Sequence, residues 1–350
     1  MNKIIFPLVI LLFFSCKQAT PEKPETELKE KAPIEEQIDF TMIFASCNDQ
    51  NMEQPLWKPI LETAADVFVW GGDNIYADTD DMALMMAEYD KVTMNPEYKK
   101  LSENTQIIGT WDDHDYGKND AGAEWEAKAK AQQLFLDFMG VPKEDARRDR
   151  EGVYYSETFT NPKGSIKVIV LDTRYFRDPL KEVTIEGVRY QAWGKGEGGT
   201  QLGEVQWNWL EKELEEDTAT FTVIVSSIQF LADEHGWEKW GNFPDEVDKM
   251  WQMLKNAKAK NIFILSGDRH LAEFSVAEVE GLPYPLVEFT ASGMTKTYPD
   301  SPVDPNRYRK GEQIKELNFG WIGFDFANKK VSMEIRGENN KIIETLEQAY

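Results

Sequence analysis

Asp73 and Tyr76 follow an apolar segment and have side chains that could bind a metal or a phosphate. The segment 67–70 (VFVW) stops at two glycines, and GGDNIYAD at 71–78 then presents the carboxylate and the phenol. A short apolar run between glycines is typical of a strand buried on both faces of an α/β sheet. Ligands of such sheets bind beyond the carboxyl ends of the strands, where Asp73 would lie. Asp after Gly is also common in ordinary turns, so this motif alone leaves both interpretations open.

The same arrangement recurs along the sequence. Apolar runs that end in candidate ligands stand at 40–47 (FTMIFASC), 105–115 (TQIIGTWDDHD) and 262–270 (IFILSGDRH), with weaker examples at 165–174 (SIKVIVLDTR) and 221–229 (FTVIVSSIQ). Six strands that end in polar residues are hard to explain by turns and helix caps alone. We therefore expect these strand ends to converge on one site.

The segment 112–115 (DDHD) is the densest group of ionisable side chains. Adjacent carboxylates repel one another unless they are protonated, hydrogen-bonded or bound to a cation. A solvated acidic turn is the alternative, although Trp111 beside the group is unusual for one. Asp268 and His270 form a second group. Two of the three histidines of the chain, His114 and His270, stand in these groups, which favours a metal centre over ordinary buried histidines.

Net charge limits the class of partner. The chain has 39 Lys and Arg against 62 Asp and Glu, a formal net charge of −23. Such an acidic surface disfavours nucleic acids and anionic lipid headgroups as electrostatic partners. A phosphate substrate would need local positive charge, for which bound multivalent cations are the simplest source.

The order of the segments predicts an α/β fold. Strand-like runs alternate with amphipathic stretches at 55–65, 123–139, 203–216 and 244–259. Runs with short connections then follow at 286–291, 319–326 and 330–336, and they predict antiparallel strands in a second sheet. The chain of 350 residues, 41% of them hydrophobic, can bury a large core, and no internal linker rich in Gly, Ser or Pro divides it. We expect one catalytic domain over residues 39–350.

The first residues predict export. Residues 1–15 hold one lysine and an apolar run too short to span a bilayer, as in a signal peptide. The stretch from Leu12 to Cys16 resembles the lipobox of bacterial lipoproteins, whose cysteine is lipidated after the signal is removed; a general export signal is the alternative. Residues 16–38 predict a flexible tether. We expect the protein in the bacterial cell envelope, anchored to a membrane by the lipid on Cys16, at the periplasmic face or the cell surface.

An ordered series of motifs carries a family resemblance. The motifs are SCN at 46–48, GGDNIYAD at 71–78, TWDDHDYGKND at 110–120, LDTRYFR at 171–177, SSIQF at 226–230 with EKWGNFP at 238–244, and SGDRH at 266–270. Over about residues 40–337 they resemble the PhoD-like metallophosphatases, the alkaline phosphatase D family of the calcineurin-like superfamily, which is related to purple acid phosphatases. The resemblance implies an α/β (α+β) four-layer α/β/β/α sandwich, with two mixed sheets packed face to face, helices outside and metals at the strand ends.

The resemblance implies a first metal site of mixed donors. Cys47 stands at the position of the first ligand, Asp73 would bridge two metals, and Tyr76 and His270 would complete the site. Phenolate and thiolate donors favour Fe³⁺ here. A free cysteine is more commonly a small buried hydrophobe, which is the alternative for Cys47. If Cys16 is lipidated, no second thiol remains for an intramolecular disulfide.

A second, oxygen-rich site is implied as well. Asp113, Gln229 and Asp268 occupy positions where the superfamily usually has Asn and His. Hard oxygen donors without imidazole favour Ca²⁺ or Mg²⁺ over Zn²⁺. The resemblance implies a centre of Fe³⁺ and Ca²⁺, with Mg²⁺ or Zn²⁺ less expected.

The implied activity is that of a phosphoric ester hydrolase that cleaves monoesters, diesters or both with a metal-bound hydroxide as nucleophile. His114 is the best candidate to protonate the leaving group, with Asp115 to orient it. Arg174 could bind phosphate oxygens with its guanidinium fork or form an ion pair with Asp172, and Asn119 could donate to phosphate.

Several classes of phosphoester substrate are compatible with the sequence. The family often has an N-terminal β-domain, for which we see no room, and a C-terminal helix over the site, whereas the tail at 344–350 is short; we expect an open cleft for diesters or bulky monoesters. Trp237 and Trp240 flank His235 in a loop and could line a substrate rim.

A phospholipase-like phosphodiesterase acting on lipid headgroups, or a metal-binding surface lipoprotein without catalysis, is the alternative. We expect a monomer.

Overall fold

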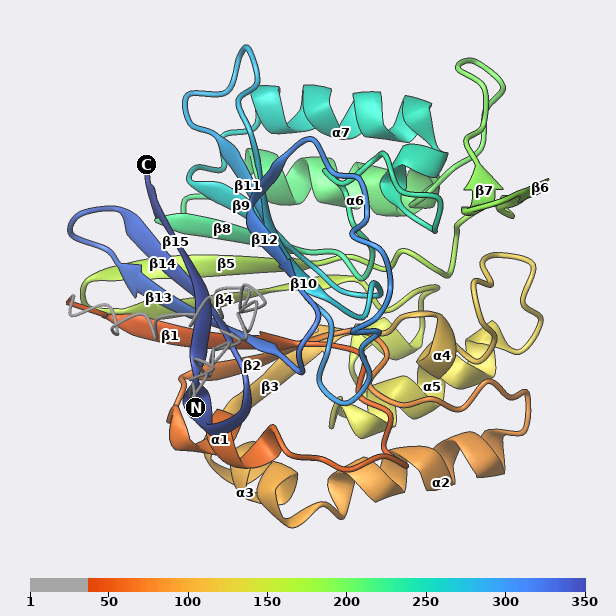
Figure 1. Ribbon diagram of the computed structural model, residues 1–350, viewed down its shortest axis with the longest axis horizontal. Coiled ribbons are helices and arrows are strands. Elements are labelled where there is room, and N and C mark those ends of the chain that lie inside the picture. Colours follow the sequence, from red (N-terminus) through yellow and green to blue (C-terminus); the bar gives the residue numbers. More distant parts are fainter. Residues whose placement is uncertain (1–36) are drawn as a thin grey trace, which may run out of the picture. The chain divides into compact units, whose positions relative to one another are not determined.

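Two mixed β-sheets form the centre of the structure, a computed structural model that describes residues 37–350 (Figure 1). The first sheet has the order β15-β14-β13-β1-β2-β3, with β1 at Phe40–Ala45, β2 at Val67–Gly71, β3 at Gln106–Thr110, β13 at Phe319–Asp325, β14 at Lys330–Arg336 and β15 at Ile342–Ala349. The second has the order β12-β10-β11-β9-β8-β5-β4, with β4 at Tyr155–Asn161, β5 at Gly164–Val170, β8 at Phe221–Val225, β9 at Ile262–Ser266, β10 at Ala272–Ala277, β11 at Leu286–Ala291 and β12 at Arg309–Ile314. The expected signal peptide, the lipidated Cys16 and nearly all of the tether lie outside the described residues.

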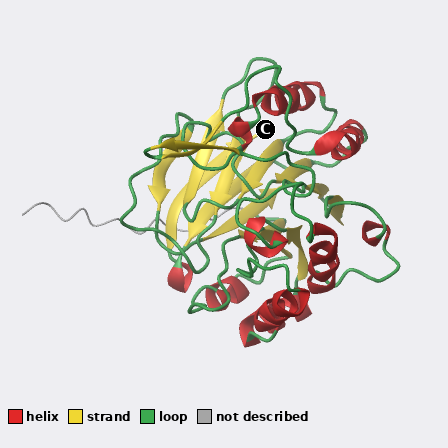
Figure 2. Cartoon of the chain, turned by 90° about the vertical axis from the view of Figure 1, so that its right-hand side faces the viewer, coloured by secondary structure: helices red, strands yellow, loops and turns green. Residues whose placement is uncertain are grey.

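Helices cover the outer faces of the two sheets. The helices are α1 (Trp57–Glu62), α2 (Met82–Thr93), α3 (Pro96–Asn104), α4 (Asp113–Tyr116), α5 (Lys128–Phe138), α6 (Gly203–Glu215) and α7 (Pro244–Asn256), with short 3₁₀ turns at Ala146–Arg148, Trp240–Asn242 and Glu338–Asn340. The first five share a core with the first sheet, and α6 and α7 share one with the second. Figure 2 shows the strands between these two groups of helices. The predicted four-layer α/β/β/α sandwich is confirmed.

Strands β1 and β2 are buried on both faces, as their apolar runs predict. In β2, Val67 and Val69 belong to the core between the two sheets, whereas Phe68 and Trp70 belong to the core beneath the helices. Successive side chains of a strand point to opposite faces, so an uninterrupted apolar run fills both cores. Full burial of one such side chain stabilises the fold by roughly 1.5–3 kcal/mol. This burial holds both strands, and with them the residues that follow, in place.

The carboxyl ends of the central strands meet at one edge of the sandwich. Strands β1, β2 and β3 run parallel, and so do β5, β8, β9 and β11 of the second sheet. The loop after β9 approaches the first sheet so closely that a Cβ on Gly267 would lie 2.5 Å from Oγ of Ser46 and 2.9 Å from the carbonyl oxygen of Gly71. Glycine at this position therefore brings the loops of both sheets together.

The last third of the chain differs from the expected separate antiparallel sheet. Strands β13, β14 and β15 are antiparallel, but they extend the first sheet beyond β1, and β11 lies parallel to β9 in the second sheet. β13 pairs with the edge of β1 that faces away from β2, and it satisfies the backbone hydrogen-bonding groups of that edge. Hairpin β6 (Lys181–Ile185) with β7 (Val188–Gln191) stands apart from both sheets. Within residues 37–350, no helix combines the length and apolar character needed to cross a bilayer.

Candidate metal centre and active site

The structure brings the four predicted ligands of the first site together. Ligand atoms of Cys47, Asp73 and His270 lie within 4.8 Å of one another. Sγ of Cys47 is 3.4 Å from Oδ2 of Asp73, and the Tyr76 hydroxyl is 3.2 Å from that same oxygen. The hydroxyl also lies 3.3 Å from Nε2 of His270. A thiol, a carboxylate, a phenol and an imidazole from the loops after β1, β2 and β9 thus lie around one point.

His270 presents Nε2 to this point because its other ring nitrogen is engaged. Nδ1 lies 2.9 Å from the carbonyl oxygen of Lys296, an acceptor, so Nδ1 carries the proton and Nε2 is left as a ligand. Burial lowers the pKa of His270 to about 4, which keeps the ring neutral at physiological pH. A neutral imidazole is the form that binds metals.

The backbone is strained at the candidate ligands. Cys47, Asp73, Asp268 and His270 have φ values of 59°, 53°, 67° and 55°. Residues other than glycine rarely adopt this left-handed conformation, and such strain concentrates at functional sites. Each of the four strained residues contributes a ligand atom to one of the groups of candidate metal donors.

Three aspartates form an adjoining group of oxygen donors. Ligand oxygens of Asp112, Asp113 and Asp268 lie within 4.8 Å of one another, and Asp73, Asp113 and His114 form an overlapping group. Oδ2 of Asp112 is buried and has no hydrogen-bond partner among the described residues. Burial raises the pKa values of Asp73 and Asp112 well above their ordinary range and raises that of Asp268 to about 8. A bound cation would satisfy the orphaned oxygen and let these carboxylates ionise, so the donor set fits the implied metals.

His114 is held at the edge of this group through one of its ring nitrogens. Its Nδ1 lies 2.8 Å from Oδ2 of Asp78, and its ring packs against the Tyr76 ring with centroids 4.1 Å apart and a tilt of 31°. Burial lowers the pKa of His114, but Asp113, Asp73 and Asp78 outweigh burial and raise the pKa to about 11. The imidazolium form is therefore stable beside the carboxylates. Cations bound to Asp73 and Asp113 would weaken this effect.

Asp115 does not orient His114, contrary to the prediction. Its Oδ1 accepts the backbone N–H of Asp112 at 2.6 Å and that of Asp73 at 3.2 Å, and its Oδ2 accepts from Nδ2 of Asn74 at 2.5 Å. Asp115 lies in the first turn of α4, where an acidic side chain commonly turns back to the free N–H groups of the helix start. Asp115 thus fixes the turn that carries Asp73, and Asp78 orients His114.

Arg174 has neither of its two predicted roles in this structure. It is fully buried and does not line the cavity. Its Nε lies 2.5 Å from Oδ1 of Asp112, and its Nη1 lies 2.6 Å from Oε2 of Glu238. Asp172 instead accepts the backbone N–H of Arg174. The guanidinium is held beneath the aspartate group, where it neutralises Asp112 and Glu238.

Gln229 lies in a polar network on the second sheet. Its Nε2 donates to Oε1 of Glu273 at 2.9 Å and to Oγ1 of Thr290 at 3.0 Å. Only its Oε1 could bind a cation, so its role as a ligand stays a prediction.

A cavity of about 940 Å³ opens beside these groups. Asp113, His114, Asp268 and His270 line its inner end, and Asn119 also lines it, with Nδ2 2.6 Å from Oδ2 of Asp120. Of the two predicted rim tryptophans, Trp237 lines the cavity, whereas Trp240 is fully buried and donates to Ser226.

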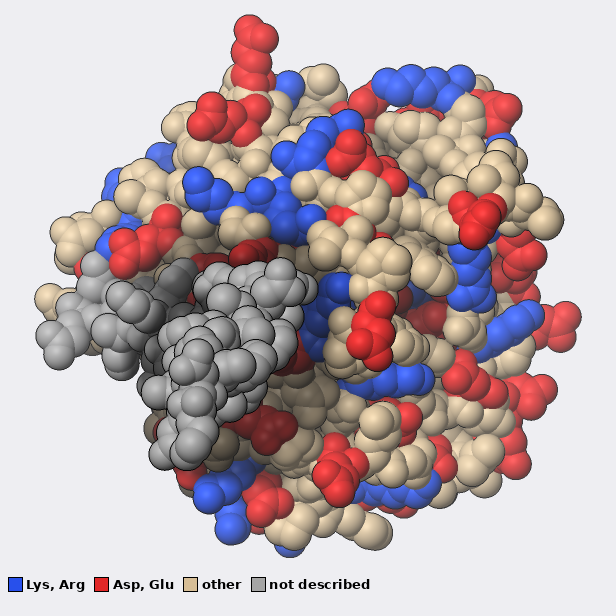
Figure 3. All heavy atoms as spheres, viewed as in Figure 1, with Lys and Arg blue, Asp and Glu red and all other residues tan. Residues whose placement is uncertain are grey.

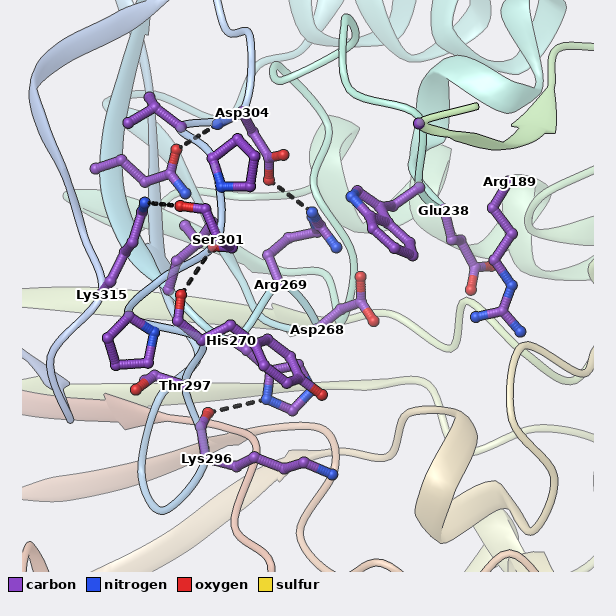
Figure 4. Close-up of a pocket in the computed structure, with 18 of the residues that line it drawn as sticks. Arg189, Glu238, Asp268, Arg269, His270, Lys296, Thr297, Ser301, Asp304 and Lys315 are labelled. Atoms are coloured by element: carbon purple, nitrogen blue, oxygen red, sulfur yellow. Dashed lines mark hydrogen bonds and ion pairs between the residues drawn. The ribbon is translucent and has the colours of Figure 1, made fainter. Parts of the chain in front are cut away.

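Four basic side chains of the cavity were not predicted from the sequence: Arg189, Arg269, Lys296 and Lys315. Figure 4 labels them around the opening, whereas Figure 3 shows acidic and basic side chains intermixed on the visible face. The position of Arg269 between Asp268 and His270 is a signal that could have identified it. Arg189 reaches the cavity from the hairpin of β6 and β7, for which the sequence holds no such signal.

The chain is similar to known proteins in its family model and in its fold. A search of curated proteins finds no significant match. Among solved structures, "Structure of PhoD" matches with a TM-score of 0.67 and 17% identity, covering 89% of this chain and 68% of that one. The structure described as GAP50, the anchor in the inner membrane complex of Plasmodium, matches with a TM-score of 0.56 and 12% identity, covering 89% and 88%. The family model of PhoD-like phosphatases matches residues 42–334. The chain therefore belongs to the PhoD-like phosphatase family, a family of metal-dependent phosphoester hydrolases.

Proposed function

We propose that this protein hydrolyses phosphate monoesters and diesters at a centre that holds Fe³⁺ in the first site and Ca²⁺ in the second. The observation that carries the proposal is the difference between two adjoining donor groups at one cavity. Cys47, Tyr76 and His270 offer sulfur, phenol and nitrogen, whereas Asp112, Asp113 and Asp268 offer only carboxylate oxygens. The first set suits a redox-active transition metal and the second a hard cation. Asp73 belongs to groups on both sides.

Protein side chains around the cavity supply the remaining requirements of phosphoester hydrolysis. Bound cations would activate water and stabilise charge on phosphoryl oxygens. His114, oriented by Asp78, lines the cavity with Nε2 available to give a proton to the leaving group. The Lys296 ammonium lies 5.0 Å from the centre of the Tyr76 ring, and no carboxylate partner accompanies it in the described contacts. We propose that the Lys296 ammonium binds a phosphoryl oxygen that the cations do not contact.

The fold by itself does not decide between catalysis and metal binding, because it is shared with a protein described as an anchor. The pair of His114 and Asp78 favours catalysis. A metal-binding protein has no need of an imidazole with its proton held in place beside the cation site. The net charge of −23 gives no support to a lipid surface as the substrate.

The test is hydrolysis of p-nitrophenyl phosphate and bis-p-nitrophenyl phosphate before and after treatment with a chelator. Activity should disappear with the metals and return when iron and calcium are added together. Asp113→Asn should abolish activity, whereas Asp90→Asn, an exposed aspartate on α2, should leave it unchanged. Hydrolysis by metal-free protein would contradict the proposed function. A strong preference for the monoester would contradict only the open cleft.

We also propose that a lipid on Cys16 anchors the protein in the bacterial cell envelope. The support is the resemblance of Leu12 to Cys16 to a lipobox. Fatty-acid label should enter the wild-type protein and not Cys16→Ser, and equal labelling of both would contradict the anchor.

A further inference from the structure

The two most exposed aromatic side chains of residues 37–350 both face the active-site cavity. Trp237 is 44% exposed and Tyr298 is 52% exposed, and both line the cavity. Val303, 60% exposed, lines it too. Large apolar surface left in water forgoes the stabilisation that burial would give. Exposed apolar surface inside a cavity is a common feature of ligand-binding sites.

Both aromatic side chains contact the segment that bears the metal ligands. The guanidinium carbon of Arg269 lies 5.4 Å from the ring centre of Trp237, and the ring of Tyr298 lies 5.0 Å from that of His270. Figure 4 shows Asp268, Arg269 and His270 at the centre of the lining residues. A substrate whose phosphoryl group lies at the metal ligands would therefore place its organic part against these rings.

The backbone near Trp237 is held in place without a ligand. The N–H of Trp237 donates to Nδ1 of His235 at 3.2 Å, and its carbonyl accepts from Nζ of Lys239 at 3.1 Å. Gly236 packs so tightly on the hairpin of β6 and β7 that a Cβ there would lie 2.1 Å from the carbonyl oxygen of Gly187. Trp237 is thus positioned before substrate arrives, which lowers the entropy lost on binding.

The loop that carries Tyr298 is restrained in a similar way. The carbonyl of Tyr298 accepts hydrogen bonds from the backbone N–H of Ser301 at 3.1 Å and from the Ser301 hydroxyl at 2.8 Å. Pro299, Pro302 and Pro305 restrict the same loop. With a volume of about 940 Å³, the cavity has room for an organic group much larger than phosphate.

We propose that Trp237 and Tyr298 form an aromatic subsite that binds a flat ring in the organic part of the substrate. The preferred substrates are phosphoesters that bear an aromatic ring close to the phosphoryl group, rather than esters of small alcohols. Contact of that ring with the exposed surface of Trp237 or Tyr298 provides the binding energy, and Arg269, whose guanidinium carbon lies over the Trp237 ring at 5.4 Å, adds a cation to the subsite. This inference rests on the proposed phosphoesterase function.

The test compares benzyl phosphate with ethyl phosphate. Both release a primary alcohol, so their intrinsic reactivities are similar and the ring is the main difference. The wild-type protein should prefer benzyl phosphate in kcat/KM by about tenfold or more. Trp237→Ala and Tyr298→Ala should each lower the ratio of kcat/KM for benzyl phosphate to kcat/KM for ethyl phosphate by about tenfold.

Met94→Ala is the matched control, because Met94 is an exposed apolar residue at the end of α2, outside the cavity lining. Equal changes for both esters in the two aromatic variants, or no preference for the benzyl ester in the wild-type protein, would overturn the subsite. Binding of benzylphosphonate and ethylphosphonate, measured by calorimetry, distinguishes a missing subsite from a missing phosphoesterase activity. The protein could hydrolyse neither ester and still bind benzylphosphonate more tightly than ethylphosphonate. If Trp237→Ala then loses this preference, the subsite exists and the proposed activity fails.

Discussion

The Sγ atom of Cys47 lies 3.4 Å from Oδ2 of Asp73, at the ends of the neighbouring parallel strands β1 and β2. Burial raises the pKa of the Cys47 thiol well above its ordinary value, and the carboxylates of Asp73 and Asp268 raise it further. Without a cation the thiolate is therefore strongly disfavoured. A cation between the two residues would reverse both effects, so metal binding and loss of the thiol proton would occur together.

Replacement of the soft donors should remove the iron. Cys47→Ser should lose iron and the visible charge-transfer band, and Tyr76→Phe should lose the band because the phenolate is gone. Tyr89→Phe is the control, since Tyr89 is buried in the core beneath the helices and its hydroxyl has no hydrogen-bond partner among the described residues. Metal analysis and visible spectra report the outcome. Unchanged iron and spectrum in Cys47→Ser would refute Cys47 as a ligand.

The role of His114 predicts a dependence on the leaving group. His114→Gln should lower kcat for alkyl phosphates by about 100-fold or more, because an alkoxide needs a proton as it leaves. The loss should be much smaller for p-nitrophenyl phosphate, whose leaving group is stable as an anion. Asp78→Asn should follow the same pattern more weakly, since Nδ1 of His114 lies 2.8 Å from Asp78. Equal losses for both substrate classes would show that His114 does not protonate the leaving group.

Arg174 should be essential for stability as well as for the second site. Arg174→Met leaves Asp112 buried without its cation and takes from Glu238 one of its two arginine partners, the other being Arg177, and the free energy of unfolding should fall by about 3–5 kcal/mol. Lys143→Met, which breaks an exposed pair with Asp137, should cost less than about 1 kcal/mol. Denaturant unfolding measures both. A cost for Arg174→Met as small as that of the exposed pair would contradict this role.

Calcium affinity gives a second measure of the same residue. A milder variant, Arg174→Lys, keeps the charge but cannot contact both carboxylates as a planar fork does. Its Ca²⁺ affinity should fall while its iron content stays constant. A parallel loss of both metals would show that Arg174 supports the fold generally and not the second site.

Glu288 predicts a pH dependence of the stability of the fold. Burial raises its pKa to about 7 from an ordinary value near 4.5, although the N–H groups of Phe230 and Leu231 oppose the shift. The folded protein holds this proton more tightly than the unfolded chain does. The contribution of protonated Glu288 to the free energy of unfolding is therefore complete below pH 4.5 and is lost as the pH rises through about 7.

Glu288→Gln removes this titration. The decrease in unfolding free energy between pH 5 and pH 8 should shrink by about 1–3 kcal/mol relative to the wild-type protein. Loss of one hydrogen bond from the loop at Phe230 and Leu231 adds a cost that is the same at every pH. Glu312→Gln, an exposed residue on β12, is the control. A variant with an unchanged pH profile would refute the shift.

The central strands and the residues after them could be predicted because each is a local feature. The apolar run that ends before Asp73 is buried on both faces, and parallel strands bring such ends to one edge whatever the loops do. Cys47, Tyr76 and His270 followed from the same rule together with the family resemblance. Asp112 stood in the predicted acidic group, and only its unpartnered Oδ2 distinguishes it as a candidate ligand.

Directions set by distant residues could not be predicted. Nε2 of Gln229 is bound by Glu273 on β10, and Arg174 is turned toward Glu238 rather than its sequence neighbour Asp172. Arg189 and Lys296 reach the cavity from a hairpin and a loop whose positions depend on tertiary packing. The sequence holds no local signal for any of these contacts.

Elemental analysis of the purified wild-type protein tests the central claim, an asymmetric centre with a mixed-donor site beside an all-oxygen site. We predict iron and calcium in the same preparation, each at about one or more atoms per chain. Iron should fall in Cys47→Ser while calcium remains, and calcium should fall in Asp112→Asn while iron remains. A protein that binds neither metal, or that loses both together in each variant, would contradict the account.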